Sequence, residues 1–266
     1  MKGSRMKTPE AKAKEEFAIA FRPRATEKVS IEIPKDVLDS LKQVAADRDM
    51  SLQALLKFYI GQGSRHVTSL MWAAQDGYLA LVRFLVEDGA DVRIRDADGW
   101  TALMKAANGG HLEVVKFLVA CGAEVNARNN ADWTALMKAA MEGHLALVHF
   151  LVQYGADIHI KNKEGETALM RAAWGGHLEV VKFLASKEGD IHAKDNRGWT
   201  ALMKAAVGGH LDVVRFLVDL GANVNALNES GDTALTWAVE GLQIEGGKKK
   251  RCYKEVVAFL RAAEAV

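Results

Sequence analysis

The sequence has few prolines, few cysteines and no long hydrophobic run. Only 3 prolines occur among 266 residues, of which 49% are hydrophobic and 26% charged, so the composition is that of a globular chain with a sizeable core. The two cysteines, Cys121 and Cys252, are too far apart for a CxxC pair, which argues against a zinc ribbon or disulfide scaffold and favours a reducing compartment. No run of about 18 apolar residues exists, so we expect neither a membrane span nor a secretory signal.

The chain as a whole has almost no net charge, whereas its N-terminal segment is basic. The total of 35 Lys and Arg against 34 Asp and Glu gives a net charge of +1, which provides no general attraction to nucleic acid or to an anionic membrane. Residues 1–66 carry 13 Lys and Arg against 9 Asp and Glu, a net charge of +4, and the remainder is net −3. This asymmetry marks the N-terminal end as the candidate for DNA contact.

One motif recurs every 33 residues in the rest of the chain. It reads TSLMWAA, TALMKAA, TALMKAA, TALMRAA, TALMKAA and TALTWAV, beginning at residues 68, 101, 134, 167, 200 and 233. A glycine followed by tyrosine or histidine, and then a phenylalanine, recur at the same spacing in the first five units. Each unit predicts a short helix with its threonine as N-cap and a second helix over a segment such as GHLEVVKFLV, followed by a polar turn.

This period and pattern resemble the ankyrin repeat, with the signature D-x-x-G-x-T-P-L-H-x-A-A-x-x-G-H. Alanine replaces the proline of that signature, and Met104, Met137, Met170 and Met203 replace its histidine. The resemblance implies a mainly α fold, a solenoid of six helix-turn-helix units with short hairpin turns over residues 67–266. It also implies protein partners on the concave face and the hairpin tips.

The last unit contains ten extra residues, near 241–253, which include the basic run at 248–251. We interpret this run as a solvated loop, with a nuclear-localisation or phosphate-contacting role as the alternative. The helix that ends at Val266 is expected to cap the solenoid.

Two sets of residues within the units are candidates for partner binding. A basic residue occupies one position of the first helix in four units, and four equal charges in a row favour an acidic partner. A tryptophan precedes the threonine in three units, at the hairpin tips, where tryptophan is typical of interface hot spots. The competing hypothesis for both sets is packing on the adjacent unit. The candidates are Lys105, Lys138, Arg171 and Lys204, together with Trp100, Trp133, Trp199 and Trp174.

Neither a metal site nor a catalytic constellation is expected. His111, His144, His177 and His210 recur one unit apart, and ligands of one zinc must lie within about 2.1 Å of it, so they cannot share an ion. We expect them to bond locally at the start of the second helix. No nucleophile elbow, GxGxxG motif or acidic pair at a recognisable spacing occurs. The sequence therefore predicts no enzyme, no metal and no cofactor.

The first 66 residues have a different design. Residues 1–25 are expected to form a basic flexible arm, within which the alternation around Phe17 and Ile19 is compatible with a short strand. Alternation at residues 28–34 predicts a strand that ends at Pro34, followed by a helix over residues 36–47 and another that starts at Ser51. One strand and two helices cannot close a core alone, so residues 26–66 are expected to pair with a second copy.

This order of elements resembles the ribbon-helix-helix family of bacterial repressors and antitoxins. The resemblance implies a homodimer whose paired strands enter the DNA major groove. Carried over to this chain, Lys28, Ser30 and Glu32 face the bases, and the helix start at Ser51 and Leu52 holds a phosphate.

The whole sequence thus predicts a DNA-binding adaptor: a dimeric head for DNA with ankyrin arms for a protein partner. We expect such a protein to be a transcriptional regulator or an antitoxin-like protein. It would be located in the bacterial cytoplasm and associated with the nucleoid if it binds DNA. Two alternatives remain, a dimeric ankyrin scaffold that does not bind DNA and an inhibitor of one protein partner.

Overall fold

A computed structural model describes residues 14–19, 29–47, 51–52, 54–55, 67–244 and 247–264 of the chain. It divides into two compact units. The first unit contains residues up to Ala73 together with Tyr78–Asp91, and the second contains Ala74–Gly77 together with the residues from Val92 onward.

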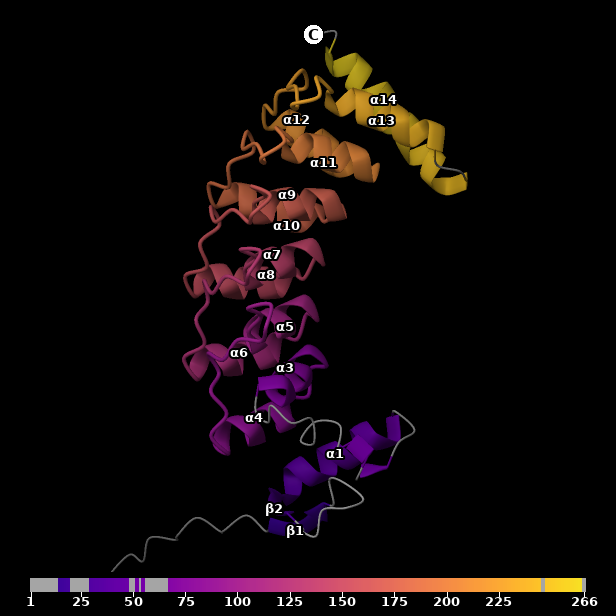
Figure 1. Ribbon diagram of the computed structural model, residues 1–266. Coiled ribbons are helices and arrows are strands. Elements are labelled where there is room, and N and C mark those ends of the chain that lie inside the picture. The colour runs from indigo at the N-terminus through magenta and orange to yellow at the C-terminus, as the bar shows by residue number, and fades with distance from the viewer. Residues whose placement is uncertain are drawn as a thin grey trace, which may run out of the picture. The chain divides into compact units, whose positions relative to one another are not determined.

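The second unit is a stack of helix pairs, one pair for each of the last five sequence repeats (Figure 1). The first helices of successive pairs contact one another, as do the second helices, so each pair buries its apolar faces against its neighbours. The first helices are α5 (Ala102–Asn108), α7 (Ala135–Met141), α9 (Ala168–Gly175), α11 (Ala201–Gly208) and α13 (Ala234–Ile244). The second helices are α6 (Leu112–Ala120), α8 (Leu145–Gln153), α10 (Leu178–Ser186), α12 (Leu211–Asp219) and α14 (Gly247–Glu264).

Each first helix begins at the threonine that the sequence pattern indicated. The side chain of Thr101 accepts a hydrogen bond from the backbone N–H of Met104 at 3.3 Å, and Thr134, Thr167 and Thr200 do the same in their units. The prediction of threonine N-caps is confirmed in these four units, and each cap satisfies a donor that the first turn would leave unpaired. The methionine that follows the cap is buried in all four units, so the side chain that replaces the ankyrin histidine serves the core.

The repeated histidines join successive units, which corrects the expectation of local bonding. The Nε2 atom of each ring bonds the carbonyl oxygen at the end of the first helix in the preceding unit, 36 positions earlier. The distance is 2.8 Å from His111 to Gln75 and 2.9 Å from His177 to Met141. A Cβ on Gly110, whose φ is +75°, would lie 2.5 Å from the His144 ring, so the glycine makes room for the next unit's histidine.

The hairpins between the helix pairs are also joined from unit to unit. The backbone N–H of Asn130 donates to the Asp98 carbonyl at 2.9 Å, and the backbone N–H of Asn196 donates to that of Glu164 at the same distance. Within a hairpin, Asp96 Oδ1 accepts from the Trp100 backbone N–H at 2.8 Å, and an Asp or Asn has this role in every later hairpin. These bonds fix the residues that precede each threonine cap.

The basic run in the last unit is helical, so the expectation of a loop is wrong. Residues 248–251 belong to the first turns of α14, with Lys249, Lys250 and Arg251 exposed. Their long side chains are compatible with helix, and the ten extra residues are taken up in longer helices α13 and α14.

The first unit contains a two-stranded antiparallel sheet and helices. Strand β1 (Lys14–Ile19) pairs with β2 (Val29–Pro34), and α1 (Lys35–Asp47) follows β2 directly and contacts both β2 and α4. The unit also includes α4 (Leu79–Glu87) and most of α3 (Val67–Gln75). β1 lies within the segment expected to be a flexible arm, and β2 pairs with a strand of its own chain instead of a second copy, so the pairing of a ribbon-helix-helix module is not found.

Candidate functional site

The tryptophans and the basic residues of the candidate set form one structure. The hairpins carry Trp100, Trp133 and Trp199, whereas Trp174 lies in α9. The first helices carry the cations, and each cation lies over an indole ring. The distances from cation to ring centroid are 4.4 Å for Lys105 and Trp100, 4.8 Å for Lys138 and Trp100, 3.9 Å for Lys138 and Trp133, 4.8 Å for Arg171 and Trp133, 4.8 Å for Arg171 and Trp174, and 5.1 Å for Lys204 and Trp199. All are within the range of cation–π attraction. We call these eight residues the Trp–cation ladder.

The members of the ladder differ in exposure. Trp100, Trp133 and Trp199 are half-buried, because each ring rests on a first-helix cation. Trp199 also packs against Trp237 in a tilted arrangement, with 4.6 Å between ring centroids. Trp174 is 45% exposed although it is one of the largest apolar side chains of the unit. The first three tryptophans therefore pack on the first helices, as the competing hypothesis expected, whereas Trp174 is the more exposed member of the ladder.

Carboxylates neutralise most of the cations, so the ladder is not a run of four equal charges. Lys105 lies 3.9 Å from Asp96, and Lys204 lies 2.9 Å from Asp195 and 2.7 Å from Glu166. Arg171 lies 3.3 Å from the same glutamate. Spacing alone could not show these pairs, because they depend on how each hairpin folds over the first helices.

Glu166 links two units from a buried position. It occupies the place of the tryptophan in the fourth unit, and its side chain is only 7% exposed. Although burial acts to raise the pKa of this carboxyl, hydrogen bonds from Lys204 and Asn162 and the charge of Arg171 lower it below its usual value. The carboxylate therefore stays ionised and holds α9 and α11 together through their cations.

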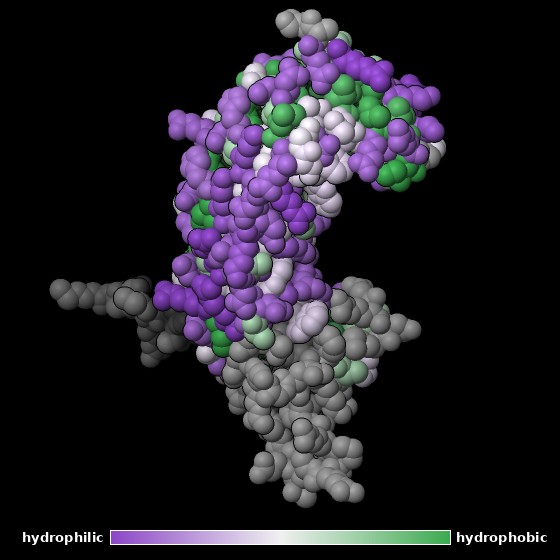
Figure 2. Space-filling view, turned by 45° about the horizontal axis from the view of Figure 1, so that its top comes forward, coloured by the Kyte–Doolittle hydropathy of each residue, from purple (hydrophilic) through white to green (hydrophobic). Residues whose placement is uncertain are grey.

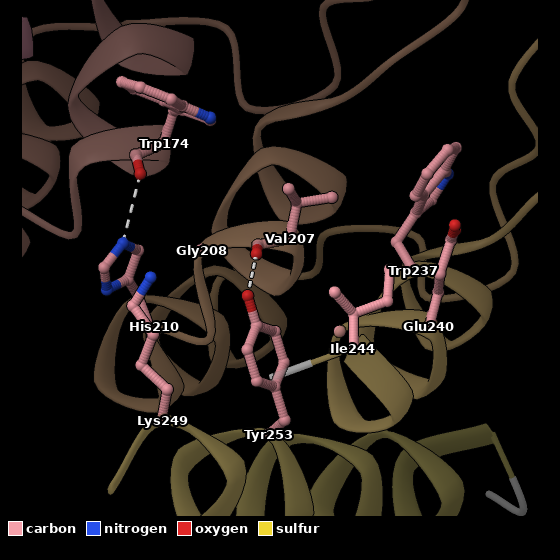
Figure 3. Close-up of a pocket in the computed structure, with 10 residues that line it drawn as sticks. Trp174, Val207, Gly208, His210, Trp237, Glu240, Ile244, Lys249 and Tyr253 are labelled. Atoms are coloured by element: carbon pink, nitrogen blue, oxygen red, sulfur yellow. Dashed lines mark hydrogen bonds between the residues drawn. The ribbon is translucent and has the colours of Figure 1, made fainter. Parts of the chain in front are cut away.

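A cavity of about 460 Å³ lies at the C-terminal end of the stack, beside the exposed Trp174 (Figure 3). Figure 3 shows His210 and Lys249 on one side of Tyr253, and Ile244, Glu240 and Trp237 on the other. The lining residues are Trp174, Val207, Gly208, His210, Trp237, Glu240, Gly241, Ile244, Lys249 and Tyr253. We call this cavity the C-terminal pocket. In Figure 2 hydrophilic side chains cover most of the repeats, and larger hydrophobic patches lie over the C-terminal helices.

Tyr253 explains how the pocket arises. Its hydroxyl donates to the carbonyl oxygen of Val207, at the position where the preceding units accept a histidine (Figure 3). The separation is 46 residues instead of 36, so the ten extra residues lie between the two partners. The lengthened α13 and α14 therefore extend past this bond and form a wall of the pocket. Tyr253 was not among the predicted site residues, although the repeat spacing enlarged by ten residues identifies it in the sequence.

His210 lines the pocket with a neutral ring. Burial lowers its pKa, the hydrogen bond to the Trp174 carbonyl opposes the shift, and the charges of His177 and Lys249 lower the pKa further. No group of three or more His, Cys, Asp or Glu side chains is placed to hold a metal ion in the part of the chain that the structure describes. None of the described helices has the length and apolar character needed to cross a membrane.

The residues expected to contact DNA are only partly described. Lys28 lies outside the described residues, whereas Ser30 and Glu32 lie in β2, paired in register with Ala18 and Glu16 of β1. The side chain of Ser51 accepts a hydrogen bond from the backbone N–H of Ala54 at 3.1 Å, and Leu52 is half-buried. Ser51 is therefore a helix N-cap, in agreement with the predicted helix start.

A solenoid of helix pairs that carries an aromatic and cationic surface is a protein-recognition scaffold. The family model described as Ankyrin repeats (3 copies) matches residues 42–129, 127–195 and 187–260. The chain therefore belongs to the ankyrin-repeat family, and its repeats are a module for protein–protein interaction. None of the curated proteins compared with it matches. The first match begins within α1, so the family model also covers part of the segment that the sequence analysis assigned to a separate module.

Proposed function

We propose that this chain binds a protein segment laid along the Trp–cation ladder, with an apolar side chain of that segment in the C-terminal pocket, and that it acts by binding and not by catalysis. The observation that carries the proposal is the position of Trp174, an exposed tryptophan at the edge of a cavity lined largely by aromatic and aliphatic groups. Exposed tryptophans beside a pocket are typical anchors of protein interfaces.

Substitution of Trp174 tests the proposal. Because the ring is largely exposed, Trp174→Ala should leave the free energy of unfolding nearly unchanged and weaken binding by about 2 kcal/mol. The probe is a synthetic array of random-sequence peptides with amidated C-termini, from which the tightest ligands of the parent protein are taken for titration.

Tyr154→Ala is the matched control, because Tyr154 is also a large exposed aromatic residue but lies at the end of a second helix. Equal losses in the two variants, or no loss in Trp174→Ala, would contradict the proposed surface.

A second proposal is DNA binding by the first unit, as expected for a transcriptional regulator or antitoxin-like protein. Its support is the net charge of +4 in residues 1–66 and the direct succession of β2 and α1.

Fluorescence anisotropy with a labelled DNA duplex from upstream of the gene tests this second proposal. Lys28→Ala and Ser30→Ala are each expected to weaken DNA binding by about 1 to 3 kcal/mol. Light scattering should then report a dimer. If the protein is a monomer and does not bind DNA at low salt, the DNA-binding proposal is wrong, and the chain is an ankyrin scaffold or inhibitor.

A further inference from the structure

The four cations of the Trp–cation ladder are not equivalent. Lys105, Arg171 and Lys204 each lie within ion-pair distance of a carboxylate. Lys138 has no such neighbour among the residues that the structure describes. The cause is visible in the sequence of its unit, where Asn129 takes the hairpin position that Asp96 and Asp195 occupy beside the other two lysines.

Lys138 is nevertheless the cation that the aromatic rings hold most closely. Its ammonium lies 3.9 Å from the centroid of Trp133 and 4.8 Å from that of Trp100, so two indoles from successive hairpins flank it. The residue is half-buried, and its ammonium nitrogen is not completely enclosed, so the ammonium remains in contact with solvent. The side chain is thus positioned in advance, which reduces the entropy that a ligand must overcome.

The charges around Lys138 are mainly of its own sign. Burial lowers the pKa of this lysine, and Arg171 and Lys105 lower it further, whereas Glu142 acts in the opposite direction without reaching ion-pair distance. A carboxylate placed at the ammonium would reverse this imbalance. It would also supply the group that Asp96, Glu166 and Asp195 supply elsewhere in the ladder.

We propose that Lys138 binds the carboxylate of an acidic side chain, Asp or Glu, in the protein segment that lies on the ladder. The inference rests on the proposed function and adds the chemical class and position of one ligand group. The acidic residue meets the third repeat, between Trp100 and Trp133, and forms a charge-assisted hydrogen bond to an ammonium that the indoles partly shield from water. The bound segment is therefore acidic at one defined position and is not required to be acidic throughout.

The experiment compares peptides that differ only in this group. Each ligand taken from the amidated array is synthesised with every acidic residue changed in turn, Glu to Gln or Asp to Asn, and titrated against the parent protein. We expect one position at which the neutral form binds about tenfold more weakly. The parallel series with a free C-terminus distinguishes a side-chain carboxylate from a terminal one.

Two variants assign that position to Lys138. Asn129→Asp gives the lysine an internal carboxylate and should keep the fold, because Asp96 and Asp195 accept the same hairpin hydrogen bond. Lys138→Met removes the charge but keeps a long apolar side chain between the indoles. In both variants the acidic and neutral peptides should bind equally, at the affinity that the neutral peptide has for the parent protein. That unchanged affinity also shows that the variants are folded.

Gln153→Glu is the control for charge alone. It adds the same charge to the same repeat at the exposed end of α8, and it should preserve the tenfold preference. A preference that survives Asn129→Asp and Lys138→Met, or that Gln153→Glu abolishes equally, overturns the inference while leaving the proposed function in place. Equal binding of acidic and neutral peptides by the parent, or binding that requires a free C-terminus, does the same. Failure of every peptide to bind the parent overturns both proposals.

Discussion

At the scale of single residues, Glu166 is the position where the ladder departs most from its own pattern. Three of the hairpins place a tryptophan there, whereas this one places a carboxylate that is only 7% exposed and contacts cations from α9 and α11. Removing one member of a buried ionic group leaves the others without compensation, which costs more than the group contributes. This carboxylate should therefore matter more to stability than any exposed ion pair of the chain.

The substitution Glu166→Gln should lower the free energy of unfolding by about 3 kcal/mol, because the buried Arg171 would lose its counter-charge and Lys204 would keep only Asp195. Urea denaturation at neutral pH measures the change. The control is Glu179→Gln, which breaks an exposed pair with Lys182 and should cost less than about 0.5 kcal/mol. Similar costs for the two variants would mean that Glu166 has no special role.

The same carboxylate should make stability depend on pH. Its pKa in the folded protein is lowered, so its contribution is complete above the ordinary carboxyl value of 4.5 and is lost as pH falls through the lower folded pKa. The difference in stability between the parent and Glu166→Gln should therefore shrink as the pH falls below 4.5. A difference that stays constant down to acid unfolding would show that the pKa of Glu166 is not lowered.

At the scale of elements, the 33-residue spacing was sufficient to predict the helix pairs and their threonine caps, because each unit repeats the same local hydrogen bonds. It could not predict which cation meets a carboxylate, since Glu166 and Lys204 come from different units 38 positions apart. The composition of the basic run at 248–251 predicts a loop and the structure shows a helix, because composition alone cannot distinguish an exposed helix from a loop. The sequence also did not identify β1 as the partner of β2, because the alternation at Phe17 and Ile19 is too short to favour pairing within the chain over pairing with a second copy.

Tyr253 should control the attachment of the last helix pair. Tyr253→Phe removes the hydrogen bond to the Val207 carbonyl and keeps the buried ring, so it should cost about 1 kcal/mol. Hydrogen exchange measured by mass spectrometry should show faster exchange in α13 and α14, with α5 to α8 unchanged, because repeat stability depends mainly on nearest neighbours. Uniform acceleration along the solenoid would contradict this view of the C-terminal cap.

At the scale of the whole molecule, the described residues of the N-terminal segment are integrated with the first helix pair. Helix α1 buries Val37, Leu38 and Leu41 and contacts α4, and the ankyrin family model begins at residue 42. A chain that starts at residue 67 should therefore melt about 5 °C or more below the full chain, because the apolar face of α4 loses its cover. Equal melting temperatures would show that the repeats do not depend on α1.

The central claim is that a protein segment lies on the Trp–cation ladder and enters the C-terminal pocket, and hydroxyl-radical footprinting of a peptide complex tests it most directly. A peptide ligand selected on the parent protein should protect Trp174 and the pocket residue Ile244 from oxidation, because both are exposed in the absence of a ligand. Tyr154 and Leu220, exposed at the ends of second helices, should be oxidised at an unchanged rate. Protection of Tyr154 and Leu220 with none at Trp174 and Ile244 would contradict the account, since the peptide would then lie on the opposite helices.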